Sequence, residues 1–399
     1  MPIDGYTRFG GKHWETATLR NVLANAGVVA PHTGDPYSEE MLLGLGGGVG
    51  GGYFVFEWDD GPTFFIGTRG LWHKVGGEFS QNVIDRVGGK LTIRESKGKK
   101  APLQHLLEPL EDGRPVIAWV DQGGLTYLGF AGARYIFYAV VVCGHDAEAD
   151  TFEIDDLGPA AWTLSGEALA EARAMIPSQK NRVMTVEPPA KPADLGEGIV
   201  AGIRDCLDDL HSKRMKNFGL TAFEKWQQLI AGSKGKESWA KVFPPGPELY
   251  SALYSTYYFI EAYGTGGGGF RSMYAGFLDE AAGMLDNAKL GAVAEDYRKL
   301  AKRWTRLAES ALPEGVPLLE KTRQLLQKKH DLVHDRGVKA QDEIGKLQKE
   351  LDALRQQAGE DFPLGEDEAE ALRRDLQGQI GESAAGETEA AERLAAAIG

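Results

Sequence analysis

The sequence predicts an α+β fold class, in which a mixed segment of helices and strands precedes an almost wholly helical one. Two apolar runs rich in β-branched residues, 115–121 and 135–143, predict buried strands in the first segment. The proline-rich stretch 188–192 has the composition of a linker. Apolar residues beyond it recur at helical spacing. We therefore expect strands before the linker and helices after it.

The first predicted helix carries Leu19, Val22 and Leu23 on one face. It begins near His13 and ends at Gly27, a residue typical of helix C-termini. The other elements of this segment are expected as strands at 53–57, 63–67, 115–121, 135–143 and 151–155, and as helices at 79–87, 103–110 and 165–173. Together they define a first domain over residues 1–187.

The second segment, residues 188–312, is expected to be an all-α domain. Its predicted helices are 195–210, 223–230, 249–262, 270–285 and 293–311. In the tail, 313–399, apolar residues recur every seven positions from Leu319 to Leu354, which indicates a coiled-coil seam or a helical hairpin. Residues 361–399 hold ten acidic and three basic side chains, so we expect a frayed helix or a disordered end there.

Composition excludes several classes of function. The formal net charge is −14 and the pI is about 5.2, which disfavours nucleic acid and anionic membranes as partners. No run of 18 apolar residues and no signal peptide is visible. The two cysteines, Cys143 and Cys206, form no CxxC pair, so we expect a cytoplasmic protein without a cysteine-rich metal site.

Two glycine-rich runs are candidate binding loops. The run at 44–52 has no following Gly-Lys-Ser/Thr and lies between a helix and a strand, so it is neither a P-loop nor a dinucleotide fingerprint. We expect close backbone approach there, with amides of Gly47 and Gly48 free to contact an oxygen or an acyl chain. The run at 264–269 precedes Arg271; it suits a phosphate, or else a flexible hinge with a surface arginine.

Five ordered motifs carry a family resemblance, at 13–21, 38–48, 113–121, 139–146 and 264–271. They resemble the butirosin biosynthesis protein H N-terminal family followed by the helical domain commonly fused to it, and the whole resemblance covers roughly residues 8–310. The resemblance implies a papain-like, cysteine-peptidase-type fold for the first domain. It also implies aminoacyl transfer from a carrier-protein thioester, so that the phosphopantetheine arm of an acyl carrier protein is the one cofactor-like group expected.

The resemblance also implies roles for individual residues. Trp14 stands at the position of the family's nucleophilic cysteine, and Tyr138 stands at that of its histidine. Asp155 or Asp156 fills the third position; because neighbouring strand residues face opposite ways, one of the two should enter the site and the other should be solvated. We select Asp155, together with Tyr138 and His13, as the catalytic candidates, since an imidazole suits general base chemistry.

The remaining candidates are substrate contacts. Trp14 could form a flat wall over a substrate or simply fill the former cleft. The other predicted contacts are Glu15, Gly47, Gly48, Asp121 and Arg271. Cys143 lies in an apolar strand and Cys206 lies beside acidic residues, so neither is expected to act as a nucleophile. No metal site is expected.

Two functions remain open at this point. The first is an enzyme of specialised metabolism that transfers, condenses or cyclises a carrier-bound acyl chain without an enzyme-bound intermediate. The second is a catalytically inactive relative that binds a carrier protein, a peptide or a metabolite. An acyl carrier protein or a small molecule is the expected partner in the first case, and the heptad pattern of the tail also permits a homodimer.

Overall fold

The computed structural model describes residues 3–58, 61–71, 74, 77–130, 134–191, 193–212, 215–232 and 235–399. Helix makes up 57% and strand 14% of the chain, with a sheet near the N-terminus and helices after it. The mixed class predicted from sequence is therefore confirmed. Within the described ranges, no helix is both long enough and apolar enough to cross a membrane. Pro192, in the predicted linker, lies outside the described residues.

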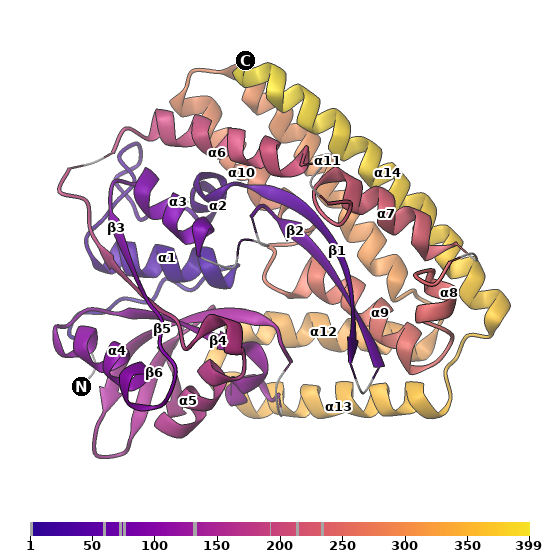
Figure 1. Cartoon of the computed structure of the whole chain (residues 1–399), viewed down its shortest axis with the longest axis horizontal. Coiled ribbons are helices and arrows are strands. Elements are labelled where there is room, and N and C mark those ends of the chain that lie inside the picture. The colour runs from indigo at the N-terminus through magenta and orange to yellow at the C-terminus, as the bar shows by residue number, and fades with distance from the viewer. Residues whose placement is uncertain are drawn as a thin grey trace. The chain divides into compact units, whose positions relative to one another are not determined.

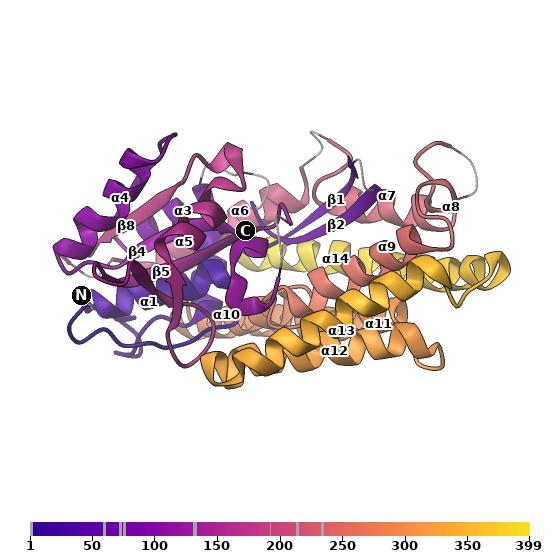
Figure 2. The same cartoon turned by 90° about the horizontal axis from the view of Figure 1, so that it is seen from below.

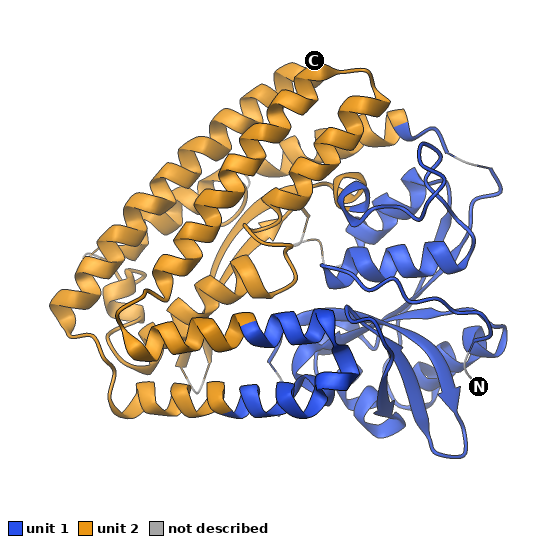
Figure 3. Cartoon of the chain, turned by 180° about the vertical axis from the view of Figure 1, so that it is seen from behind, with its two compact units in different colours: residues 1–42, 75–195, 328–349 blue, residues 43–74, 196–327, 350–399 orange. Residues whose placement is uncertain are grey.

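The chain forms two compact units, each assembled from segments that are distant in sequence (Figure 3). The first unit contains residues 1–42, 75–195 and 328–349, and the second contains 43–74, 196–327 and 350–399. Both units therefore draw on the N-terminal and the C-terminal parts of the chain. The division into domains at 1–187, 188–312 and 313–399 stays a sequence-based prediction.

The first unit is built on a six-stranded sheet in which all neighbouring strands are antiparallel. In spatial order the strands are β3 (Lys90–Arg94), β8 (Val183–Glu187), β4 (Val116–Asp121), β5 (Phe137–Asp146), β6 (Thr151–Asp155) and β7 (Trp162–Ser165). Helix α1 (Trp14–Asn25) packs against β4 and β5. The other helices of this unit are α3 (Glu78–Arg86), α4 (Lys100–Glu111) and α5 (Gly166–Ala174). Every residue of β4 is buried, as its unbroken apolar pattern predicts.

The second unit surrounds a two-stranded hairpin, β1 (Val49–Trp58) and β2 (Gly61–Arg69) (Figure 1). Strand β1 packs against α7 (Leu220–Ile230), and β2 packs against α9 (Pro247–Tyr257). The sequence grouped these strands with the first segment because they come early in the chain. The other helices of this unit before the C-terminal tail include α6 (Leu195–Leu210), α8 (Trp239–Val242), a π-turn at Tyr258–Ala262, α10 (Arg271–Met284) and α11 (Ala288–Ala311).

The C-terminal tail consists of three helices, α12 (Pro317–Asp335), α13 (Gln341–Glu360) and α14 (Glu366–Ile398). A 3-10 turn at Gly337–Ala340 joins α12 to α13, and the two helices run side by side in both views (Figures 1 and 2). Helix α14 packs on α7 and α11 and buries Leu376, Ile380 and Leu394. The expected frayed or disordered acidic end is therefore wrong, because an apolar face runs along this helix among its acidic residues.

Candidate functional site

The start of α1 is occupied by a carboxylate of the chain itself. Glu39, the first residue of α2 (Glu39–Gly46), accepts hydrogen bonds from the backbone N–H groups of Lys12 (2.7 Å) and His13 (3.0 Å). The Thr16 hydroxyl donates to the same carboxylate at 2.8 Å. Burial raises the pKa of Glu39, and these hydrogen bonds partly offset the rise. The favourable positive end of the helix is therefore already filled by a buried acid.

Trp14 is the first residue of α1, and only 4% of it is exposed. Its ring meets the edge of Trp119 with 5.6 Å between centroids and lies beside the Tyr138 ring at 5.7 Å. The His13 ring is 4.8 Å away. These spacings are typical of packed aromatic pairs. The indole thus lies within an aromatic cluster that joins α1 to β4 and β5.

Tyr138 is linked to Asp156 rather than to Asp155. Its hydroxyl donates to Asp156 Oδ1 at 2.9 Å, and the Tyr127 hydroxyl donates to Asp156 Oδ2 at the same distance. The Leu157 N–H also donates to Oδ1, at 2.8 Å. Burial raises the pKa of Asp156 to about 6 despite these three donors. The choice of Asp155 as partner of Tyr138 is therefore corrected: Trp14, Tyr138 and Asp156 form the connected line.

Asp155 belongs to a different group of side chains. It accepts a hydrogen bond from the Tyr6 hydroxyl at 2.6 Å, and burial raises its pKa to about 7. Its Oδ1 atom is buried and has no hydrogen-bond partner within the described part of the chain. Asp155 and Asp156 are only 1% and 4% exposed. The expectation that one of them is solvated is wrong, because both are buried and Asp155 is hydrogen-bonded to Tyr6 of the N-terminal segment.

The other candidates of the first unit are also buried. Glu15 accepts a hydrogen bond from the Ser80 hydroxyl at 2.7 Å. Asp121 ends β4, and its Oδ1 accepts the N–H groups of Gly123 (2.6 Å) and Arg134 (3.0 Å). This carboxylate therefore holds the turn that follows the strand. The structure brings His13, Trp14 and Tyr138 together, whereas Glu15 and Asp121 have hydrogen-bond partners of their own.

Gly47 and Gly48 lie in the second unit, where they end α2. The Gly47 N–H donates to the Gly44 carbonyl at 3.1 Å, and the Gly48 N–H donates to the Leu43 carbonyl at 2.9 Å. Their φ angles are +117° and +65°, and a Cβ on Gly48 would overlap the Tyr274 ring. Close backbone approach is confirmed at Gly48. The expectation of free amides is wrong, because both N–H groups close the helix end.

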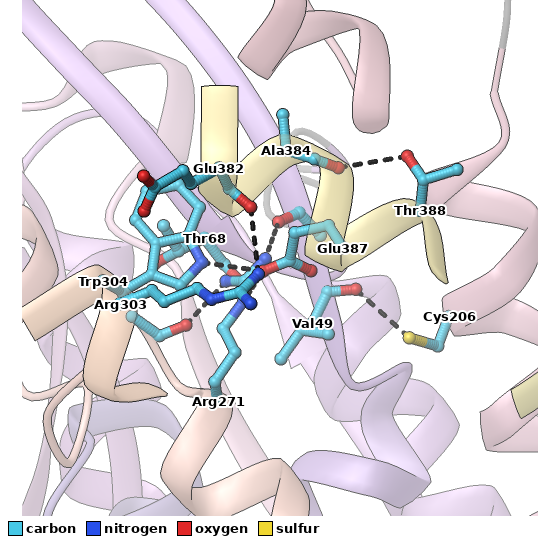
Figure 4. Close-up of polar contacts among 12 residues, drawn as sticks. Val49, Thr68, Cys206, Arg271, Arg303, Trp304, Glu382, Ala384, Glu387 and Thr388 are labelled. Atoms are coloured by element: carbon cyan, nitrogen blue, oxygen red, sulfur yellow. Dashed lines mark hydrogen bonds and ion pairs between the residues drawn. The ribbon is translucent and has the colours of Figure 1, made fainter. Parts of the chain in front are cut away.

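Arg271 is completely buried at the start of α10 (Figure 4). Its Nε donates to Glu387 at 2.7 Å, Nη1 donates to the Thr68 carbonyl at 2.8 Å, and Nη2 donates to the Gly50 carbonyl at 3.0 Å. The Trp304 indole N–H donates to the same glutamate oxygen at 2.7 Å. The expectation of an accessible guanidinium, whether for a phosphate or on a hinge surface, is therefore wrong. Arg271 joins β1, β2, α10 and α14.

The second glycine run is also matched to a carboxylate of the chain. The Gly268 N–H donates to Glu261 Oε1 at 3.0 Å, and the Thr305 hydroxyl donates to the same atom at 2.8 Å. Gly264 and Gly266 to Gly269 all have positive φ angles, a conformation that favours glycine. Burial raises the pKa of Glu261. The loop that suggested a phosphate therefore already contacts a glutamate.

Neither cysteine has the environment of a nucleophile. Cys143 and Cys206 are both buried, and burial raises the pKa of each thiol to about 12. The expectation that Cys143 is a small buried hydrophobe is confirmed. Among the residues that the structure describes, no group of three or more His, Cys, Asp or Glu side chains is arranged to hold a metal ion.

Sequence reasoning missed Glu39, Tyr127 and Trp119 as partners of the site. Glu39, which lies inside the motif 38–48, is the most informative of them, since its carboxylate accepts the backbone N–H groups at the start of α1. An acidic residue in the first turn of a helix usually stabilises that same helix. Nothing in its spacing shows that it reaches the start of α1 instead, so tertiary structure was needed to find it.

Two family models match the chain. Residues 13–157 match the model described as butirosin biosynthesis protein H, N-terminal, and residues 167–329 match one described as a domain of unknown function (DUF4872). The region that matches the first of these models contains α1 and the Trp14, Tyr138 and Asp156 line. A comparison with curated proteins finds no match to this chain.

Proposed function

We propose that this chain is an acyltransferase-like biosynthesis protein that acts on an activated acyl chain without forming an acyl-enzyme at position 14. The observation that carries the proposal is the Trp14, Tyr138 and Asp156 line, in which an indole at a helix start is followed by a phenol and a buried carboxylate. In the family chemistry these three positions hold a thiol, its base and the residue that orients the base.

A papain-like arrangement is part of this proposal. It is supported by a helix start that faces two antiparallel strands, with the three positions on α1, on β5 and directly after β6. An indole cannot attack a thioester, and a phenol with an ordinary pKa near 10 is a poor base at neutral pH. Catalysis would then depend on holding the acyl donor and an amine acceptor together, which can supply roughly 7–11 kcal/mol.

His13 is the proposed general base of this direct transfer. Its ring lies against Trp14 at the start of α1, and an imidazole is suited to accept the proton that an attacking amine releases. The amine nitrogen would form the new amide bond while the thiol leaves and takes up a proton. An acyl carrier protein, or a small thioester in its place, is the proposed donor.

A transfer assay tests the proposal. The wild-type chain is incubated with an acyl N-acetylcysteamine thioester and a panel of primary amines, and amide product and intact protein mass are both followed. We expect amide formation with no mass increase on the protein, and loss of turnover in His13→Ala with unchanged folding. A stable acyl adduct on the wild-type chain would contradict the proposal.

The burial of the line favours a second candidate, a binding protein without catalysis. His13, Trp14, Tyr138 and Asp156 are all at least nine-tenths buried, so a former cleft could be filled by the indole. This candidate predicts saturable binding of a carrier protein or metabolite by calorimetry, with no amide product for any acceptor.

A further inference from the structure

Residues 328–349, the ends of α12 and α13 with the turn between them, belong to the first unit (Figure 3). We call them the hairpin tip. The family models match residues 13–157 and 167–329, so almost all of the tip lies beyond both matched regions. Its ion pair between Lys328 and Glu343, at 2.9 Å, ties α12 to α13. The tip is therefore a part of this chain that the matched families do not account for.

The first contact of the tip is made by His334. Its Nδ1 lies 2.9 Å from the Gly11 carbonyl oxygen. Burial lowers the pKa of His334 to about 3, with a further lowering from His330, so the ring is neutral at physiological pH. Because a carbonyl only accepts, Nδ1 carries the proton and donates it. Gly11 in turn donates its N–H to the Leu157 carbonyl at 3.1 Å.

The second contact joins the turn of the tip to Gly158. A Cβ on Gly158 would lie 2.8 Å from the Val333 carbonyl oxygen and 3.1 Å from Gly337 Cα. The two backbones therefore approach as closely as glycine allows. Gly337 itself has a φ of +52°, so both sides of this contact depend on a missing side chain.

The third contact is made by α13 on Gly129. A Cβ there would lie 3.1 Å from both Gln348 Cβ and Gly345 Cα. Beside it, the Lys329 ammonium lies 3.8 Å from the centre of the Phe130 ring and donates to Gln348 Oε1 at 2.5 Å. Packing and a cation–π contact thus fix this loop against the tip.

Each glycine that the tip contacts lies two residues from a member of the site. Gly11 precedes His13, Gly129 follows Tyr127, and Gly158 follows Asp156. Tyr127 and Asp156 are hydrogen-bonded to each other, and Asp156 also accepts from Tyr138. The hairpin tip thus contacts three loops that are distant from one another in sequence. In each loop the contacted glycine lies two residues from a residue of the site.

We infer that the hairpin tip is a positioning element of the Trp14 site, and that His334 is its principal positioning residue. The tip holds the loops that carry His13, Tyr127 and Asp156 in register, and by partly closing position 14 it slows the access of small reagents. The inference does not rest on acyl transfer, because the accessibility of position 14 can be measured whatever the site does.

A cysteine at position 14 reports on this closure. In the Trp14→Cys variant the two native thiols stay buried, so iodoacetamide labelling followed by peptide mass spectrometry gives the rate at residue 14. We expect the additional change His334→Ala to raise this rate by about tenfold, the ratio implied by the loss of one buried hydrogen bond. His334→Asn, which keeps an N–H donor near the Nδ1 position, should restore the slow rate.

The matched control is Lys321→Ala, which removes an exposed ion pair with Glu350 elsewhere on the same two helices. It should leave the labelling rate unchanged. Equal rates in the His334→Ala and Lys321→Ala backgrounds would overturn the inference. Hydrogen exchange of the single variant His334→Ala, in which Trp14 is intact, tests the same inference without an introduced cysteine. Faster exchange confined to residues 11–16, 125–130 and 156–158 supports the inference, whereas unchanged exchange or a uniform rise through β4 and β5 contradicts it.

Discussion

Three glutamates, of which Glu39 and Glu387 are buried and Glu261 is half-buried, occupy places where the sequence suggested an oxygen of a ligand. Glu39 lies at the start of α1, Glu261 contacts the second glycine run, and Glu387 pairs with Arg271. Glu39 and Glu387 come from different stretches of the chain than the groups they contact, whereas Glu261 lies just before its glycine loop. Helix starts and glycine loops attract anions by their backbone dipoles, and this attraction is satisfied here by the protein itself.

The buried Arg271 and Glu387 pair predicts how strongly one substitution lowers the stability of the protein. Arg271→Ala leaves a buried, uncompensated carboxylate, so we expect it to lower the free energy of unfolding by about 3–5 kcal/mol. Arg306→Ala is the matched control, because its ion pair with Glu382 is exposed and such pairs contribute little. Urea unfolding followed by circular dichroism measures both. Equal midpoints for the two variants would show that the buried pair is not needed.

Asp155 gives a prediction for the pH dependence of stability. An aspartate in the unfolded chain loses its proton near pH 4, whereas burial raises the pKa of Asp155 in the folded chain to about 7. Between these values the folded state binds more protons, so stability falls as pH rises through this window. We expect Asp155→Asn to remove roughly 2–4 kcal/mol of that fall.

Denaturant midpoints from pH 4 to pH 8 test this expectation. The amide oxygen that Asp155→Asn introduces would still accept the Tyr6 hydrogen bond, so the comparison isolates the charge. Asp35→Asn, at an exposed aspartate, is the control and should reproduce the wild-type curve. If Asp155→Asn also follows the wild-type curve, its carboxylate is not the source of the pH dependence.

At the scale of elements, glycine allows α2 and α6 to approach each other. A Cβ on Gly202 of α6 would overlap the Gly44 carbonyl oxygen of α2. Alanine is the better helix former, yet overpacking of this kind typically costs about 1–3 kcal/mol. We therefore expect Gly202→Ala to lower the thermal unfolding temperature. Gly378→Ala on α14 meets no atom within 4 Å and should be neutral or stabilising; opposite results would refute this packing.

Element prediction succeeded where periodicity was strong and failed where glycine or mixed polarity concealed it. Helix α6 was predicted at 195–210 and has those bounds, and strands β4 and β5 were placed by their apolar runs. Helix α2 was missed because its glycines suggest a loop. Strands β3 and β8 were missed because their short, partly polar patterns become strands only by pairing with each other and, for β8, with β4.

The site could be predicted from the sequence only in part. The sequence located Trp14 and Tyr138 on their elements, and the structure places their rings together. It gave no physical ground for selecting Asp155 over Asp156, since alternation along a strand leaves both open. The Tyr6 contact that separates them spans 149 residues, and no local pattern encodes such a pairing.

At the scale of the whole molecule, residues outside the matched families complete both units. The hairpin tip belongs to the first unit, and α14 contributes Glu387 to the buried pair of the second. The acidic residues of 361–399 thus lie mostly on α14, a helix that packs within the second unit. A chain ending near residue 329 would lack both contributions, so functional work on this protein requires its C-terminal helices.

We propose that Trp14 and Tyr138 stand where the matched family has a nucleophile and its base, and that Asp156 fills the third, orienting position. The measurement that tests it most directly is the intact mass of the double variant Trp14→Cys/Tyr138→His after incubation with an acyl N-acetylcysteamine thioester. We expect one acyl adduct on residue 14, none on the wild-type chain and none on Trp14→Ser/Tyr138→His. A folded double variant that never becomes acylated, or a wild-type chain that does, would contradict it.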